Sequence, residues 1–225
     1  MVKNVVQNSR FLKKKIKKNQ KSLSSRRWIE RQINDPFVLA AAEQKYRSRS
    51  AFKLLELNEK FNIFENGDIA LDLGAYPGGW SQVLAEKIIG GKIVAIDIKE
   101  MDSLEGVYFI KEDLFEKQAQ KKIKRLISFA NVVLSDMAPS ATGHKSTDQI
   151  RSQNLADCAL DIADLFLKYN GNFCCKIIGG GETDNFIKKL KKKFKTVKVF
   201  KPISSRKESA EIFLVGLNYR QGIVE

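Results

Sequence analysis

The chain has 225 residues, of which 43% are hydrophobic, so it can bury one sizeable core, and we expect a single α/β domain with a short appendage. Lysine and arginine outnumber aspartate and glutamate by 40 to 26, and the formal charge of +14 favours a polyanionic partner such as nucleic acid. No segment has the length and hydrophobicity of a membrane span, the basic N-terminus lacks the apolar region of a secretory signal, and three cysteines with one histidine show no metal-ligand spacing. We therefore expect a cytoplasmic protein without a membrane segment or a metal site.

Residues 1–24 form a strongly basic segment that has no apolar pattern. We expect this segment to be a flexible arm that neutralises phosphates. The cluster of lysines that we expect to make these contacts is Lys13, Lys14, Lys15, Lys17 and Lys18. A helix is expected to begin just after Ser24 and Ser25, and residues 25–225 are expected to form one folded domain.

A helix is predicted over residues 51–57, because the apolar residues have helical spacing and Ser48 or Ser50 is suitably placed to cap its start. Residues 66–68 have the composition of a turn. The apolar run that follows, residues 69–73, predicts a short buried strand.

This strand leads into a turn that contains Gly74, Gly78 and Gly79, and a further helix is predicted at residues 80–89. A strand, a glycine turn and a helix start form a ligand-binding geometry, because glycines allow close backbone approach and the helix start offers unpaired N–H groups. The turn departs from the G-x-G-x-x-G pattern, and on its own it is equally compatible with a tight structural connection.

Strands and helices alternate through the rest of the chain. Further strands are predicted at residues 92–96, 107–110, 131–134, 172–178, 196–200 and 211–216, with helices at 115–129, 147–169 and 183–194. This order predicts a seven-stranded sheet, mostly parallel, with helices on both faces. The last two strands are close enough in sequence to form a hairpin, so the sheet should be mixed, with an antiparallel strand at one end. The residues expected on the buried side of the long helix are Ile150, Leu155, Leu160, Ile162, Leu165 and Phe166.

Four aspartates stand at or just after the ends of the first four predicted strands, namely Asp72, Asp97, Asp113 and Asp136. Ligands of open α/β sheets bind outside the carboxyl ends of the strands. Asp97 also follows Gly79 at about the distance at which an acid meets ribose hydroxyls in dinucleotide-binding folds. Each aspartate alone is compatible with a helix cap or a turn, whereas the four together indicate one ligand-binding crevice.

Lys176 is unusual because two cysteines and two isoleucines flank it in a strand that should be central. A lysine in such a strand is costly unless it is paired, although it can also extend its ammonium group to solvent. Glu211 begins the final strand. Lys53 lies among apolar residues of a helix and, taken alone, is compatible with an ordinary surface lysine.

At this point the chain resembles the FtsJ family of RNA ribose 2′-O-methyltransferases, over roughly residues 24 to 220. The segments that carry the resemblance are in family order and highly specific together. They are residues 24–28 (SSRRW), 47–54 (RSRSAFKL), 72–82 (DLGAYPGGWSQ) and 135–139 (SDMAP), followed by Lys201, Pro202, Ser204, Ser205, Arg206 and Glu211. The resemblance implies a Rossmann-like methyltransferase fold for residues 25–225.

The resemblance implies a catalytic tetrad formed by Lys53, Asp136, Lys176 and Glu211. It also implies S-adenosylmethionine as the methyl donor, surrounded by Gly74, Gly78, Gly79, Trp80, Asp97, Asp113 and Asp136. Tyr76 stands where the bacterial pattern often has alanine, a departure that affects the packing at the edge of the donor pocket.

The chemistry of ribose methylation is consistent with this tetrad. A ribose hydroxyl is a poor nucleophile at neutral pH and benefits from a base and from close alignment with the methyl group. Lys176 is the expected base, since burial and a second lysine nearby promote the loss of its proton. Asp136 and Glu211 are expected to orient the reacting groups, while Asp97 should hold the ribose of the donor and Asp113 should lie near its adenine.

The expected partner is ribosomal RNA. Together with the lysine cluster, the arginines expected to contact RNA are Arg26, Arg27, Arg47 and Arg49. The compact length favours the ribosomal type of the family, so the expected substrate is a ribose, that of a uridine, in 23S RNA of the large ribosomal subunit. We expect the protein to act as a monomer on the assembled particle.

Three alternatives remain open from the sequence. A transfer RNA or a messenger cap is a possible substrate within the family. A nicotinamide-dependent oxidoreductase would also use the glycine turn and Asp97, but it leaves Lys53, Asp136, Lys176 and Glu211 unexplained. A non-catalytic RNA-binding factor for ribosome assembly would have no use for these four residues.

Overall fold

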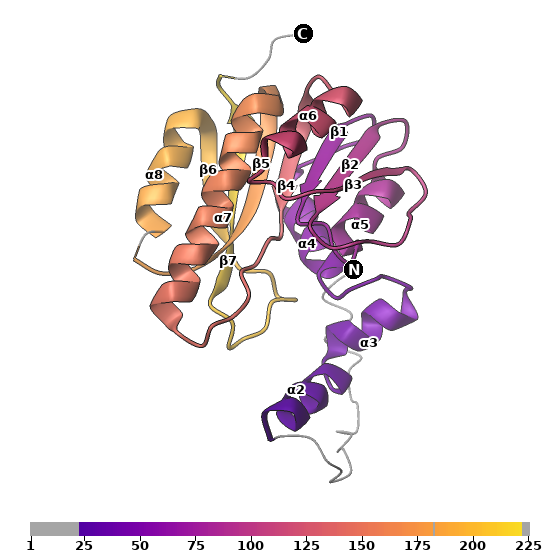
Figure 1. Cartoon of the computed structure of the whole chain (residues 1–225), viewed down its shortest axis with the longest axis vertical. Helices are drawn as coiled ribbons and strands as arrows, with labels where there is room; N and C mark the ends of the chain where they lie inside the picture. The colour runs from indigo at the N-terminus through magenta and orange to yellow at the C-terminus, as the bar shows by residue number, and fades with distance from the viewer. Residues whose placement is uncertain (1–22, 182, 222–225) are drawn as a thin grey trace.

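Seven strands form one mixed sheet in the order β3-β2-β1-β4-β5-β7-β6 in the computed structural model, which describes residues 23–181 and 183–221 (Figure 1). The strands are β1 (Ile69–Leu73), β2 (Lys92–Asp97), β3 (Val107–Lys111), β4 (Ala130–Ser135), β5 (Leu167–Ile178), β6 (Phe194–Phe200) and β7 (Glu211–Tyr219). Strand β7 runs antiparallel to both of its neighbours, and the other pairs are parallel. The predicted mixed sheet is confirmed, with its antiparallel strand next to the edge strand β6.

Helices cover both faces of the sheet (Figure 1). They are α2 (Leu23–Ile33), α3 (Pro36–Glu43), α4 (Ala51–Phe61), α5 (Gly79–Lys87), α6 (Lys117–Leu126), α7 (Lys145–Phe166) and α8 (Thr183–Lys193). One hydrophobic cluster packs α4 and α5 against the sheet, and another packs α6, α7 and α8 against the opposite face. The predicted α/β architecture is therefore confirmed.

The buried side of α7 contains Leu160, Ile162 and Phe166 as predicted, but it differs from the prediction at two other positions. Ile150 and Leu165 were expected to be buried, but they are 59% and 50% exposed. The helix instead turns Ala156, Ala159 and Ala163 toward the sheet. These small side chains recur with helical spacing and allow α7 to pack closely against β4 and β5. This close packing stabilises the fold more than the burial of Ile150 and Leu165 would.

Helix α3 was not expected from the sequence. Its start nevertheless carries the usual signature: Pro36 occupies the first turn, and the side chain of Asp35 accepts a hydrogen bond from the N–H of Phe37 at 3.0 Å. Phe37 packs on Phe52 of α4, with ring centroids 5.5 Å apart. Helix α3 is thereby attached to the main domain.

The predicted phosphate-binding lysines, Lys13, Lys14, Lys15, Lys17 and Lys18, lie outside the described residues, as do the side chains of Arg26 and Arg27. The predicted flexible arm over residues 1–24 is likewise outside them, apart from the start of α2 at Leu23. Within the described segments, no helix has both the length and the hydrophobicity required to cross a bilayer.

Candidate functional site

Two neighbouring strands direct charged side chains to one face of the sheet. In the β5–β7 pair, Lys176 is opposite Phe213 and Ile178 is opposite Glu211. Because alternate residues of a strand share a face, Lys176 and Glu211 project to the same side. Helix α4 covers this side and contributes Lys53, whose ammonium group lies 5.6 Å from the centroid of the Phe213 ring.

The four residues predicted as a tetrad form two ion pairs. Asp136 directly follows β4, whose parallel register with β5 places it beside Lys176. The Nζ atom of Lys176 lies 2.8 Å from Oδ1 of Asp136 and 2.6 Å from its carbonyl oxygen. The Nζ atom of Lys53 lies 2.8 and 3.0 Å from the two carboxylate oxygens of Glu211.

Both carboxylates of these pairs are stabilised in the ionised form. Burial alone would raise the pKa of Asp136, but the positive charges of Lys176 and Lys53 outweigh it and lower the pKa below its ordinary value. Burial also opposes the ionisation of Glu211, and its pKa is lowered chiefly by the charge and hydrogen bond of Lys53. Since each lysine acts on both carboxylates, the two ion pairs behave as one electrostatic unit.

A cavity of about 380 Å³ lies at the carboxyl ends of β1 to β4 and reaches the tetrad at Asp136. Gly74, Asp97, Asp113 and Asp136 line it, as predicted for the methyl donor, together with apolar side chains that include Leu114. Its volume and its mixture of apolar and carboxylate groups suit a nucleoside-sized ligand. Among the described residues, no group of three or more His, Cys, Asp or Glu side chains is arranged to hold a metal ion.

Gly78, Gly79 and Trp80 do not line this cavity, although they were predicted to contact the donor. The indole of Trp80 is only 2% exposed and donates a hydrogen bond of 2.9 Å to the carbonyl oxygen of Ser50. Added Cβ atoms at Gly78 and Gly79 would meet side chains of the segment that precedes α4. In this conformation the three residues pack against the segment that precedes α4. Their contact with a donor stays a prediction.

The two predicted RNA-binding arginines whose side chains are described lie in different places. The guanidinium group of Arg47 donates to the carbonyl oxygens of Asp102 and Ser103 at 2.8 and 2.7 Å. Its backbone N–H donates to the side chain of Gln82 on α5 at 3.0 Å. Arg47 therefore joins three segments around the glycine turn, whereas Arg49 faces a separate pocket, and RNA contact by either residue stays a prediction.

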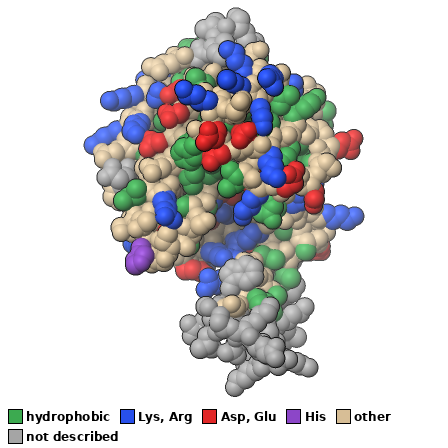
Figure 2. Space-filling view, in the orientation of Figure 1, with side chains coloured by type: hydrophobic (Ala, Val, Ile, Leu, Met, Phe, Trp, Pro, Cys, Tyr) green, Lys and Arg blue, Asp and Glu red, His purple; other side chains and the backbone are tan. Residues whose placement is uncertain are grey.

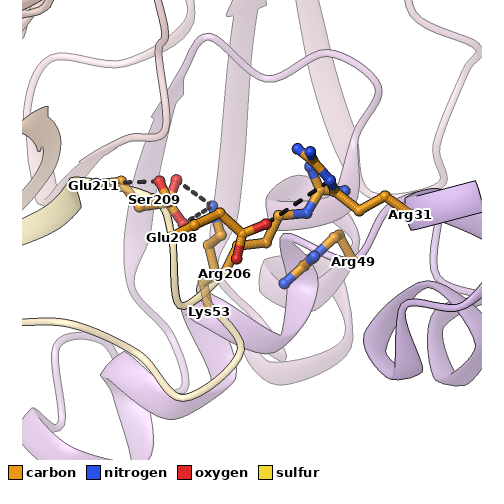
Figure 3. A pocket seen from close by; sticks show the side chains of 7 residues that line it. All are labelled: Arg31, Arg49, Lys53, Arg206, Glu208, Ser209 and Glu211. Carbon is orange, nitrogen blue, oxygen red and sulfur yellow. Dashed lines mark hydrogen bonds and ion pairs between the residues drawn. The ribbon is translucent and has the colours of Figure 1, made fainter. Parts of the chain in front are cut away.

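That separate pocket, which we call the arginine pocket, is bounded on one side by the ion pair between Lys53 and Glu211 (Figure 3). It has a volume of about 450 Å³. Its walls are formed by Arg31, Arg49, Lys53, Arg206, Glu208, Ser209 and Glu211. In the space-filling view, basic side chains gather in the recess above the segment that carries α2 and α3 (Figure 2).

Two buried carboxylates that were not predicted as site residues hold the loop between β6 and β7, which leads into Glu211. Glu56 of α4 accepts the backbone N–H groups of Ile203 and Ser204 at 2.6 and 2.8 Å. Asp35 pairs with the guanidinium groups of Arg49 and Arg206. Apart from the pair of Asp35 and Arg49, these contacts connect residues about 150 positions apart or more in the chain, and no local sequence pattern marks them.

Asp72 is a buried carboxylate beneath the glycine turn. It is 1% exposed, its Oδ2 accepts a hydrogen bond of 2.6 Å from Ser81, and its Oδ1 has no partner. Burial raises its pKa from 3.8 to about 7, with smaller opposing and reinforcing effects from Ser81, Asp136 and Asp97. Charge at this position therefore destabilises the folded state.

We expect Asp72→Asn to become progressively more stable than the wild type as the pH rises from about 5 to about 8. The folded wild type binds a proton at Asp72 more tightly than the unfolded chain does, so this contribution to stability is complete below the unfolded pKa and is lost as the pH passes through the folded pKa of about 7. Urea unfolding at several pH values measures the difference. Asp148→Asn is the control, since hydrogen bonds from Thr142 lower the pKa of this exposed carboxyl group; parallel curves for the two variants would contradict the expectation.

Comparison with known proteins agrees with this geometry. Residues 46–219 match the FtsJ-like methyltransferase family. The chain is 46% identical over 206 residues to a Rickettsia canadensis protein named ribosomal RNA large subunit methyltransferase E, covering 88% of this chain and 91% of that protein. A protein of the same name from Wolbachia sp. subsp. Brugia malayi (strain TRS) is 47% identical over 199 residues, covering 88% of this chain and 91% of that protein. A crystal structure described as a ribosomal RNA methyltransferase of Plasmodium falciparum superposes with a TM-score of 0.71 and 32% identity over 79% of this chain and 100% of that one.

Proposed function

The chain belongs to the FtsJ-like methyltransferase family, whose match covers most of its length, and we therefore propose that it methylates a ribose 2′-hydroxyl in 23S ribosomal RNA with S-adenosylmethionine as donor. The observation that carries the proposal is the two largely buried ion pairs, which meet the nucleoside-sized cavity at Asp136. The names of the relatives favour large-subunit ribosomal RNA over transfer RNA. A uridine as the target and the assembled particle as the substrate are further parts of the proposal.

The residues of the cavity fit S-adenosylmethionine. Asp97 stands at the end of β2 and Asp113 lies just beyond β3, so their carboxylates can bind the ribose and lie near the adenine. Gly74 brings the backbone of the turn up to Met137, beside Asp136, where the methionine portion would lie. The donor supplies an electrophilic methyl group on a positively charged sulfur. The ionised Asp136 favours a positive charge at this end of the cavity.

Lys176 is the proposed base for the ribose hydroxyl. Its ammonium group pairs with Asp136 at 2.8 Å, so it has to release a proton before it can accept one. That proton passes to solvent, and the neutral amine then accepts the proton of the ribose hydroxyl. Asp136 and Glu211 then hold the two lysines in place, which aligns the hydroxyl oxygen with the methyl group for in-line attack.

The proposal predicts that the protein places one methyl group on the 2′-oxygen of a defined nucleotide of 23S RNA. The test is incubation of the purified protein with labelled S-adenosylmethionine and, in parallel, large ribosomal subunits, protein-free 23S RNA and total transfer RNA. Position-specific mapping of 2′-O-methylation then identifies the nucleotide. Label in transfer RNA alone, or on a base instead of a ribose, would overturn the proposal.

Family membership excludes the nicotinamide-dependent alternative, and it identifies the chain as an RNA methyltransferase instead of a non-catalytic binding factor. The expected cytoplasmic location and monomeric state stay predictions. Ribosomal particles are in the cytoplasm, and a single copy of the chain would be enough to act on each particle.

A further inference from the structure

The arginine pocket has more cationic than anionic side chains. Four cationic side chains and two carboxylates line it. The two carboxylates already have partners: Glu211 pairs with Lys53, and Glu208 makes a long ion pair of 3.9 Å with the Nε atom of Arg31. Asp35 lies against Arg49 and Arg206 and offsets one more positive charge. The pocket therefore keeps an excess of about one positive charge, which an anion can compensate.

Several donors of the pocket are not fully used. The side chain of Arg206 makes one hydrogen bond to the described part of the chain, from its Nε atom to Asp35 at 3.4 Å. The side chain of Arg31 is 51% exposed, and its ion pair with Glu208 is long. The Nη groups of Arg49 are bound to Asp35 and to the carbonyl oxygen of Ser204, and its buried Nε atom has no partner.

The surroundings of Arg49 disfavour its charged form. Burial, followed by the positive charge of Arg206, lowers its pKa to about 10. Contacts with Asp35 and Ser204 hold its guanidinium group in place, so it acts as a fixed positive charge at the wall. Figure 3 shows Arg31 and Arg49 reaching in from one side of the pocket, with Glu211 and Ser209 on the other.

The position of the pocket suggests which anion it takes. Lys53 and Glu211 belong to the tetrad and also line the pocket. A ribose whose hydroxyl is at Lys176 would therefore have its neighbouring groups directed toward the pocket. In RNA, the 2′-hydroxyl is bonded to C2′, and the adjacent carbon, C3′, carries the 3′-phosphodiester. Arginine binds phosphate oxygens through paired N–H groups.

We propose that the arginine pocket binds the phosphodiester on the 3′ side of the methylated ribose, through Arg31 and Arg206, with Arg49 as a fixed charge. This inference rests on the proposed function and adds a phosphate site to it. Binding of the phosphate replaces the long contact between Arg31 and Glu208. It also fixes the sugar on the side opposite the methyl donor, so that the 2′-hydroxyl is aligned with Lys176.

The first test compares methyl transfer by the wild type, Arg31→Ala, Arg206→Gln and the double variant. Arg125→Ala is the matched control, because Arg125 is exposed on α6, away from both cavities. The double variant should lose roughly tenfold or more in kcat/KM for RNA, as expected for lost charge-assisted hydrogen bonds. Its affinity for S-adenosylmethionine, measured by calorimetry, should stay within about twofold of the wild type, as should the activity of the control.

The second test identifies the phosphate. An RNA fragment is prepared with a single uncharged methylphosphonate linkage on the 3′ side of the mapped ribose and is ligated into 23S RNA. The wild type should methylate it roughly tenfold more slowly than the natural linkage, whereas the double variant should treat the two substrates alike. If the neutral linkage lowers the methylation rate equally in both proteins, or does not lower it in the wild type, the phosphate site is overturned. If the wild type methylates no RNA at all, the proposed function fails first, so the two failures are distinguishable.

Discussion

Replacing Lys176 with alanine is expected to slow methyl transfer by about 10² to 10⁴-fold, while the affinity for S-adenosylmethionine changes little. The ammonium group of Lys176 lies 2.8 Å from Asp136, at the end of the donor cavity. Removal of the side chain eliminates the proposed base without altering Asp97 and Asp113 at the other end of that cavity. Single-turnover transfer to 23S RNA and calorimetry with the donor measure the two quantities.

Alanine also leaves the buried Asp136 without its closest positive charge, which can destabilise the fold by itself. Lys176→Arg removes this ambiguity. A guanidinium group keeps the positive charge beside Asp136 but does not release its proton at neutral pH. We therefore expect Lys176→Arg to bind the donor and remain folded, and yet to lose as much activity as the alanine variant.

Lys168→Ala serves as the control for Lys176, because it removes a lysine from the opposite end of the same strand, β5. It should transfer methyl groups at close to the wild-type rate. Near-normal turnover by Lys176→Arg would show that Lys176 contributes charge instead of accepting a proton. Near-normal turnover by Lys176→Ala would remove it from the catalytic step.

Most strands could be predicted because their apolar runs are short and are bounded by glycine, aspartate and asparagine. The predicted strand at residues 69–73 coincides with β1, and five other strands differ from their predictions by one to three residues at the ends. The prediction for β5 was wrong at its start, because the strand begins at Leu167, within the range predicted for the preceding helix. Three residues of the predicted tetrad stand out in a related way, since Lys176 is out of place in an apolar strand and Asp136 and Glu211 stand at strand ends. Lys53 follows the pattern of an ordinary surface lysine, and only the family resemblance adds it to the set.

The contacts that hold the site together could not be predicted in this way. Asp35, Arg49 and Arg206 form one cluster, although Asp35 and Arg206 are separated by 171 positions in the chain. Glu56 resembles any other acid on a helix until the loop it binds is placed beside it. Arg47 was expected to face RNA on the basis of its charge alone, whereas its hydrogen bonds to two carbonyl groups depend on the path of the loop between β2 and β3.

Of the four aspartates predicted to line one crevice, Asp72 is buried away from the donor cavity, whereas Asp97 and Asp113 combine a structural role with the place predicted for a ligand contact. Asp97 lines the cavity, and its carboxylate also accepts the N–H groups of Tyr76 and Lys99 at 2.9 and 2.8 Å. Asp113 lines the cavity and accepts the N–H of Phe115 at 3.0 Å. A turn residue whose carboxylate is fixed by backbone donors still has free lone pairs for a ligand, so the two roles support each other.

Replacing Gly74 with alanine is expected to weaken the binding of S-adenosylmethionine roughly tenfold or more and to reduce the free energy of unfolding by about 3 kcal/mol. Gly74 has a φ angle of +77°, and a Cβ atom there would overlap Cγ of Met137. Met137 follows Asp136 and lines the donor cavity. The added methyl group therefore has to displace the segment that carries one member of the tetrad.

Gly106→Ala separates the two causes of this expected loss. Gly106 has the same φ angle of +77°, but a Cβ atom there would have no neighbour within 4 Å. This variant should lose only the cost of a left-handed alanine, about 1 kcal/mol, and should bind the donor normally. Chemical unfolding and calorimetry on both variants give the comparison. If Gly74→Ala matched Gly106→Ala in both measurements, crowding against Met137 would be excluded as the reason for glycine at this turn, and close approach of the backbone to the donor would have to account for it alone.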